Sequence, residues 1–168
     1  FFNWYNKSML KIIGMVFFLT VAGIADSFDA KVVRVIDGDT LYVQPLNRDR
    51  IKIRMFGIDA PELRQRDGAK PGRYLAVRLA GNDVKIEPKG TDKYGRTLAI
   101  VYDKYGTDMN KEMIRLGLAW VYVKYTENPE WLALEAEARR QKIGIWRRKN
   151  PTPPWTYRIK SYKKKKRR

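Results

Sequence analysis

Short runs of alternating apolar residues between residues 31 and 102 are the feature that most constrains the fold of this chain. The segment KVVRVIDGDTLYV (31–43) places β-branched residues in two runs around Asp-Gly-Asp, and RIKIRMFGI (50–58) alternates apolar with charged residues. A period of two puts every second side chain on one face of a β-strand. DVKIE (83–87) and TLAIVY (97–102) continue the pattern across a Gly- and charge-rich turn. These segments predict a twisted, antiparallel sheet of short strands.

Helical patterns accompany and follow these strands. A short helix is expected over residues 74–80, with Pro71 near its first turn. Apolar residues recur among charged ones over residues 108–118 and 129–146, and Asn128 suits the N-cap of the second of these helices. Several strands followed by helices indicate a small α+β domain whose sheet closes into a short barrel.

The formal net charge of +17 is concentrated at the C-terminus. Residues 147–168 hold 11 basic residues and no acidic ones, whereas residues 26–146 have a net charge of +4. The Pro-rich NPTPPW (150–155) is expected to end regular structure, and the KKKKRR run (163–168) to be a solvated, disordered tail. Such an excess favours a polyanionic partner, nucleic acid before anionic membrane. We therefore divide the chain into an N-terminal segment (1–25), a folded domain (26–146) and a basic tail (147–168).

The N-terminal segment is typical of a secretory signal peptide. Lys11 precedes an apolar stretch of 13 residues (12–24), and Gly23 and Ala25 are small residues at positions −3 and −1 of a cleavage site after Ala25. The apolar stretch is shorter than the ~20 residues that a bilayer-spanning helix needs. We therefore expect export, to the periplasm or the medium. An uncleaved membrane anchor and a buried N-terminal helix are the alternatives.

The complete absence of His and Cys restricts the chemistry of any site. No imidazole is available as a general base or metal ligand, and no thiolate as a nucleophile. Ser-His-Asp triads, disulfides, zinc knuckles and iron–sulfur clusters are thereby excluded. Acid–base work therefore falls mainly to Asp and Glu.

Three motifs in the predicted barrel carry candidate functional residues. Taken separately, each is typical of a turn: IDGDT, RMFGIDAPE and TDKYGR. Together they supply side chains for phosphodiester hydrolysis without His. Asp39 and Asp59 offer oxygen ligands to a hard divalent cation, and Glu62 follows closely enough to take a proton from a water. Arg54 and Arg96 are suited to fork onto phosphate oxygens as negative charge builds up.

In order and spacing, these motifs resemble those of the thermonuclease family. IDGDT (36–40), RMFGIDAPE (54–62) and TDKYGRTLAIVY (91–102) follow the pattern of the staphylococcal nuclease-like, calcium-dependent nucleases over about residues 31–146. The resemblance implies an OB-fold barrel of five strands with three helices. It also implies hydrolysis of DNA and RNA at the 5′ P–O bond to leave 3′-phosphates. The Pro-rich, basic tail is similar to that of exported Gram-negative members.

The resemblance also implies roles by motif position. Asp39 and Asp59 match the family's Ca²⁺-binding carboxylates. Ala60 matches a position that ligates through its backbone carbonyl, where the family often has Thr. The family's catalytic residues are matched by Arg54, Glu62 and Arg96.

Substrate-binding positions follow from the same resemblance. Lys93 and Tyr94 align with contacts to phosphate and sugar. Tyr122 and Tyr125 fall near the aromatic residues that flank a bound nucleotide in the family. Residues 67–73 lie where the family starts its first helix, and their Gly and Pro residues predict a shortened or bent start.

We therefore predict a monomeric, Ca²⁺-dependent nuclease that acts on DNA and RNA without an obligate protein partner. A non-catalytic OB-fold nucleic-acid-binding protein is the main alternative, because such barrels bind single strands through basic and aromatic faces. A membrane-associated structural protein with an uncleaved anchor and a polybasic tail is a second alternative. The intact set of carboxylates favours the enzyme.

Overall fold

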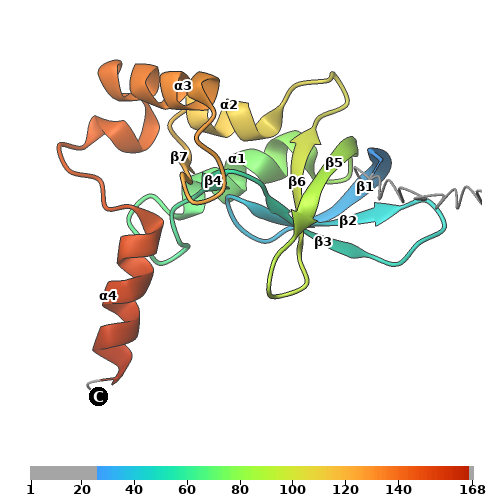
Figure 1. The fold of residues 1–168 in the computed structure, drawn as a ribbon, viewed down its shortest axis with the longest axis horizontal. Coiled ribbons are helices and arrows are strands. Elements are labelled where there is room, and N and C mark those ends of the chain that lie inside the picture. The colour runs from blue at the N-terminus through green and yellow to red at the C-terminus, as the bar shows by residue number, and fades with distance from the viewer. Residues whose placement is uncertain (1–25, 167–168) are drawn as a thin grey trace, which may run out of the picture.

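The computed structural model describes residues 26–166, in which five strands close into a barrel (Figure 1). The strands are β1 Phe28–Val35, β2 Thr40–Pro45, β3 Ile51–Met55, β5 Asp83–Thr91 and β6 Thr97–Tyr102. Around the barrel their order is β1-β2-β3-β6-β5, and β5 pairs with β1 to close it. The predicted α+β barrel is thereby confirmed.

One seam of the barrel differs from the expected antiparallel sheet. β3 and β6 pair in parallel, whereas the other four pairs are antiparallel. Parallel neighbours need a long crossover, and a helix together with β5 lies between these two strands in the chain. The purely antiparallel prediction is therefore wrong at this seam.

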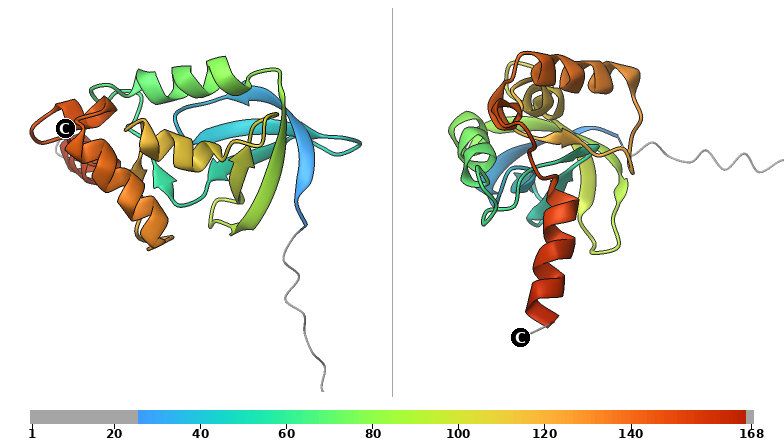
Figure 2. Two further views of the ribbon diagram at one scale, coloured as in Figure 1. Left: turned by 90° about the horizontal axis from the view of Figure 1, so that it is seen from above. Right: turned by 90° about the vertical axis from the view of Figure 1, so that its left-hand side faces the viewer.

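Helices and a short second sheet complete the described chain. The helices are α1 Ala69–Leu79, α2 Met109–Arg115, α3 Pro129–Arg140, the 3-10 turn η1 Gly144–Arg147 and α4 Pro154–Lys166. The second sheet pairs β4 Ile58–Asp59 with β7 Trp120–Val121. Seen from above, α1 runs along one side of the barrel (Figure 2).

Two of the predicted helices have different bounds in the structure. α1 begins at Ala69, so the predicted start at Tyr74 is wrong. Pro71 lies in the first turn of α1, where the absent N–H has no helical acceptor to lose. The single helix predicted over residues 129–146 is also wrong, because Lys142 adopts a positive φ of 54° and separates α3 from η1.

Apolar side chains of alternating strand residues fill the barrel. Leu41, Val43 and Ile53 are completely buried there. Asn110 of α2 is also buried, and its Nδ2 donates to the Phe56 carbonyl at 2.8 Å. This bond fixes the turn after β3, the segment that carries much of the second motif.

The basic tail is a helix at residues 154–166, so the predicted disorder is wrong there. α4 projects away from the barrel and is a fourth α-helix beside the three expected (Figures 1 and 2). Pro154 is buried at its start, and Trp155 packs on Tyr122 with ring centroids 5.7 Å apart. Lys is a good helix former, and the packed first turn supplies the nucleus that an isolated basic run lacks.

The predicted signal peptide, residues 1–25, lies outside the described residues. Between residues 26 and 166, no helix is long and apolar enough to cross a bilayer.

Candidate active site

One cleft of about 450 Å³ gathers the residues of the three motifs. It lies at the end of the barrel where β2 begins and β3 ends, and the β5–β6 turn and α4 border it. We call it the active-site cleft. Every predicted site residue lines it: Asp39, Arg54, Asp59, Ala60, Glu62, Lys93, Tyr94, Arg96, Tyr122 and Tyr125.

The Asp-Gly-Asp turn between β1 and β2 places Asp39 in this cleft. A Cβ atom on Gly38 would lie 2.4 Å from the Cβ of Pro71 and 2.5 Å from the Cβ of Ala60. Only Gly therefore allows the turn to approach α1 so closely. Asp39 is buried, and its Oδ2 accepts a hydrogen bond of 2.8 Å from the Ala60 N–H. The first and second motifs are thus joined directly.

Arg54, near the end of β3, holds the two aspartates together. Its Nε lies 3.2 Å from Asp39 Oδ1, and its Nη2 lies 3.1 Å from Asp59 Oδ1. Its Nη1 donates to the carbonyls of Met55 and Ile58, at 2.7 and 2.8 Å. The guanidinium is a rigid planar fork, so these bonds fix how the carboxylates lie relative to each other.

Asp59, the last residue of β4, is a deeply buried carboxylate whose side chain is 1% exposed. Burial raises the pKa of its carboxyl, while a hydrogen bond from Arg158 and the charge of Arg54 act against that rise. Arg158 belongs to α4, and its Nη1 and Nη2 donate to Oδ1 and Oδ2 of Asp59 at 3.1 and 2.8 Å. Two guanidiniums therefore compensate one buried negative charge.

Glu62 lies in the loop after β4 and is more accessible, with its side chain 39% exposed. Its N–H donates to Gln65 Oε1 at 3.2 Å, which fixes the loop. Its Oε1 accepts from Arg158 Nη1 at 2.7 Å. A carboxylate that is open to water beside two aspartates is suited to orient a water or to take its proton.

Arg96 is held at the cleft by Asp92 of the same β5–β6 turn. Its Nε and Nη2 both lie 2.7 Å from Asp92 Oδ2. Burial acts to raise the pKa of the Asp92 carboxyl, but hydrogen bonds from Arg96 and from the Tyr94 N–H lower it by more. The motif forms the turn that its sequence predicts, and within that turn Asp92 orients Arg96.

Aromatic and basic side chains form the rim of the cleft. Tyr94 is 72% exposed, and Lys93 lies 5.1 Å from the centre of its ring. In the loop after β7, the rings of Tyr122 and Tyr125 pack edge to face with centroids 5.2 Å apart, and Trp155 packs on Tyr122. Exposed rings beside cations are the usual means of holding bases and phosphates of a single strand.

Three charged lining residues were missed by the sequence analysis: Asp37, Lys124 and Arg158. Asp37 was interpreted only as part of a turn, although burial and the neighbouring charge of Asp39 raise its pKa to about 6. Its place in the IDGDT motif was the signal that pointed to it. Arg158 lies in the basic tail, and no local pattern distinguishes it from the other cations there.

A hard divalent cation fits the chemistry of the oxygen donors, although the aspartates are already paired. Between residues 26 and 166, no group of three or more acidic side chains is arranged to hold a metal ion. The candidate donor set is therefore two carboxylates, Asp39 and Asp59, with the Ala60 carbonyl. Both carboxylates are buried in ion pairs with arginine, so arginine supplies part of the positive charge that a bound cation would supply there.

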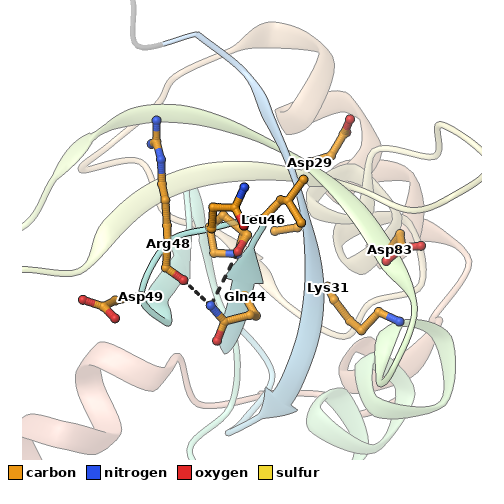
Figure 3. Close-up of a pocket in the computed structure, with 10 residues that line it drawn as sticks. Asp29, Lys31, Gln44, Leu46, Arg48, Asp49 and Asp83 are labelled. Carbon is orange, nitrogen blue, oxygen red and sulfur yellow. Dashed lines mark hydrogen bonds between the residues drawn. The ribbon is translucent and has the colours of Figure 1, made fainter.

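A larger cavity of about 970 Å³ lies at the opposite ends of β2 and β5 (Figure 3). We call it the distal hollow. Its charged residues are exposed: Asp29, Lys31, Arg48, Asp49 and Asp83. The hydrogen bonds drawn there run only from the Gln44 side chain to main-chain carbonyls of Pro45 and Arg48. Nothing in the hollow corresponds to the buried, interlocked charges of the active-site cleft.

A five-stranded OB-type barrel that gathers arginines and carboxylates in one cleft is suited to act on a phosphodiester. The model of the staphylococcal nuclease homologue family matches residues 52–148. The chain therefore belongs to the staphylococcal nuclease family of nucleases.

Relatives over most of the chain carry nuclease names. An "Uncharacterized endonuclease" of Escherichia coli O157:H7 is 41% identical over 76% of this chain and 83% of its own length. A "Micrococcal nuclease" of Shigella flexneri is 36% identical over 86% of this chain and 87% of its own length. An "Uncharacterized endonuclease" of Haemophilus influenzae is 34% identical over 91% of this chain and 85% of its own length.

Proposed function

We propose that this protein is a calcium-dependent phosphodiesterase that hydrolyses DNA and RNA at the 5′ P–O bond and leaves 3′-phosphates. The observation that carries the proposal is the convergence of two buried aspartates, Glu62 and two arginines in one cleft. The resemblance of the three motifs to calcium-dependent nucleases supports the choice of cation. A Ca²⁺ ion held by Asp39, Asp59 and the Ala60 carbonyl would neutralise charge on the scissile phosphate.

The side chains then divide the hydrolysis among them. Glu62 orients a water or takes its proton, and the water oxygen forms a bond to phosphorus. Arg96 and Arg54 stabilise the charge that accumulates on the phosphate oxygens. The bond between phosphorus and the 5′ oxygen breaks, that oxygen takes a proton, and the phosphate remains on the 3′ side.

The rim residues are proposed to hold the substrate strand. Lys93 and Lys124 are exposed cations suited to phosphate contacts, and Tyr94 is exposed beside Lys93. Tyr122 and Tyr125 line the same cleft and offer further rings. Stacking and phosphate contacts do not involve the 2′-hydroxyl that distinguishes RNA from DNA, which suits an enzyme that accepts both.

A non-catalytic nucleic-acid-binding protein remains the main alternative. Such a protein needs the basic and aromatic rim but gains nothing from anionic side chains beside a phosphate. In a pure binder, Asp39, Asp59 and Glu62 would occupy arginines that could otherwise contact the phosphates of the ligand. Their presence favours hydrolysis.

Export is proposed from the signal-like segment at residues 1–25. We propose a periplasmic or secreted, monomeric protein, with a membrane anchor as the alternative. Cell fractionation combined with N-terminal sequencing of the mature protein tests this. A protein recovered from membranes with an intact N-terminal segment would contradict export.

The enzymatic proposal is tested by incubating DNA and RNA with purified protein in calcium or in chelator. We expect degradation of both polymers in calcium only, with 3′-phosphate ends on the products. The absence of metal-dependent degradation of either polymer would overturn the proposal.

A further inference from the structure

The side chain of Arg158 lies across two carboxylates of the active-site cleft. Its guanidinium contacts both oxygens of Asp59, at 3.1 and 2.8 Å, and Glu62 Oε1 at 2.7 Å. Asp59 is a proposed cation ligand and Glu62 the proposed base. One residue of the basic tail therefore occupies the anionic groups on which the chemistry depends.

The base of α4 holds Arg158 in this position. Pro154 is buried, and Trp155 packs on the Tyr122 ring and against the apolar cluster beside Trp146. The Thr152 carbonyl, just before α4, accepts from Gln65 Nε2 at 2.5 Å. These contacts distinguish Arg158 from the exposed lysines further along the helix.

The contact resolves an imbalance of charge. Asp59 is almost fully buried, and a buried carboxylate without a cationic partner is strongly destabilising. Arg54 reaches only Oδ1 of Asp59, whereas Arg158 reaches both oxygens. The side chain of Arg158 is 44% exposed, so it is able to leave without breaking the core.

We propose that Arg158 is the resident counterion of the cation site, which neutralises Asp59 and Glu62 in the cation-free protein and is displaced when a divalent cation binds. A guanidinium and a divalent cation on the same carboxylate repel each other, so the two compete. Displacement also frees Glu62 to face a water. This inference rests on the proposed function in assigning a divalent cation to Asp59.

The calcium affinity of the full chain, measured without nucleic acid, tests whether calcium displaces Arg158. Isothermal titration compares wild type with Arg158→Gln and with Lys163→Gln, which removes the same charge from α4 at an exposed position. If the contact holds in about nine of ten molecules, its removal tightens calcium binding about tenfold. Lys163→Gln is expected to change the affinity by less than about twofold, as for other surface substitutions. Arg158→Lys keeps the charge and loses the fork, so it falls between wild type and Arg158→Gln.

Hydrogen exchange of residues 154–166 gives a second readout. Calcium should raise hydrogen exchange over residues 158–166 in wild type, because this part of α4 loses its contact with Asp59 and Glu62, and should change it little in Arg158→Gln, which lacks that contact. Equal calcium affinities of Arg158→Gln and Lys163→Gln, or weaker binding by Arg158→Gln, would overturn the proposal that calcium displaces Arg158. Calcium-dependent cleavage by wild type alongside that result leaves the proposed function standing. If none of these proteins binds calcium, both the displacement of Arg158 and the assignment of calcium are overturned.

Discussion

The active-site cleft and the distal hollow lie at opposite ends of the same strands, and the smaller of them holds the proposed catalytic residues. The distal hollow is about 970 Å³ against about 450 Å³ for the cleft. In the cleft, Asp39, Arg54 and Asp59 are buried and bonded to one another. In the hollow, charged side chains such as Arg48 and Asp83 are exposed.

From this contrast we infer that buried, interlocked charge, rather than size, marks the site. Burying charge costs folding free energy, so a cluster of charges persists in the interior only when each has a partner. Exposed charges around a hollow carry no such cost and need no function. Matched substitutions at the two ends of the barrel therefore test the interpretation.

The largest contrast is expected between Asp59→Asn and Asp83→Asn. Asp59→Asn removes a proposed cation ligand, and we expect DNA cleavage to fall by on the order of 10³. Asp83→Asn changes an exposed carboxylate and should leave cleavage within about twofold of wild type. Initial rates over a calcium titration measure both, with circular dichroism to confirm folding. Comparable losses in the two variants would remove the distinction between cleft and hollow.

A smaller contrast in stability is expected between Arg54→Lys and Arg48→Lys. Lysine at position 54 keeps the charge but cannot bridge both aspartates and two carbonyls, so we expect a loss of about 2 kcal/mol in unfolding free energy. Arg48 is exposed, and its substitution should cost less than about 0.5 kcal/mol. Urea unfolding of both variants provides the measurement. Equal midpoints would show that Arg54 does not organise the cleft.

The smallest effect is expected from the far end of α4. Replacing the four residues Lys163, Lys164, Lys165 and Lys166 by Gln leaves Arg158 in place and removes exposed cations. Affinity for single-stranded substrate should depend less on salt, by a slope of about 0.7 for each phosphate that these lysines neutralise, while turnover at saturating substrate stays unchanged. Lys31→Gln in the distal hollow should leave the slope as it is. A fall in turnover with an unchanged slope would place these lysines in the chemistry.

The barrel and most of the cleft were predictable because their signals are local. Strand alternation is visible within five or six residues, and each of the three motifs carries its site residues within a few positions of one another. Gly38 packs closely on Pro71, which lies in the first turn of α1 but is distant in the sequence. Because this packing forms only in the folded chain, the motifs did not show that α1 begins at Ala69.

The C-terminal part of the site was not predictable for a different reason. Arg158 is one cation among many in a basic tail, and its role follows from how Trp155 packs on Tyr122. Composition alone predicts that the basic run is solvated. The charge pattern of the run is the same whether or not an apolar side chain such as Trp155 anchors the start of the helix. The order of α4 depends on that anchor.

The central claim is that the active-site cleft hydrolyses phosphodiesters with Glu62 activating the water, and Glu62→Gln tests it most directly. Turnover and nucleotide affinity are measured for this variant and for Glu127→Gln, which replaces an exposed Glu before α3. We predict that Glu62→Gln lowers turnover by ~10² or more at nearly unchanged nucleotide affinity, and that Glu127→Gln behaves as wild type. Near-normal turnover of Glu62→Gln would contradict the account.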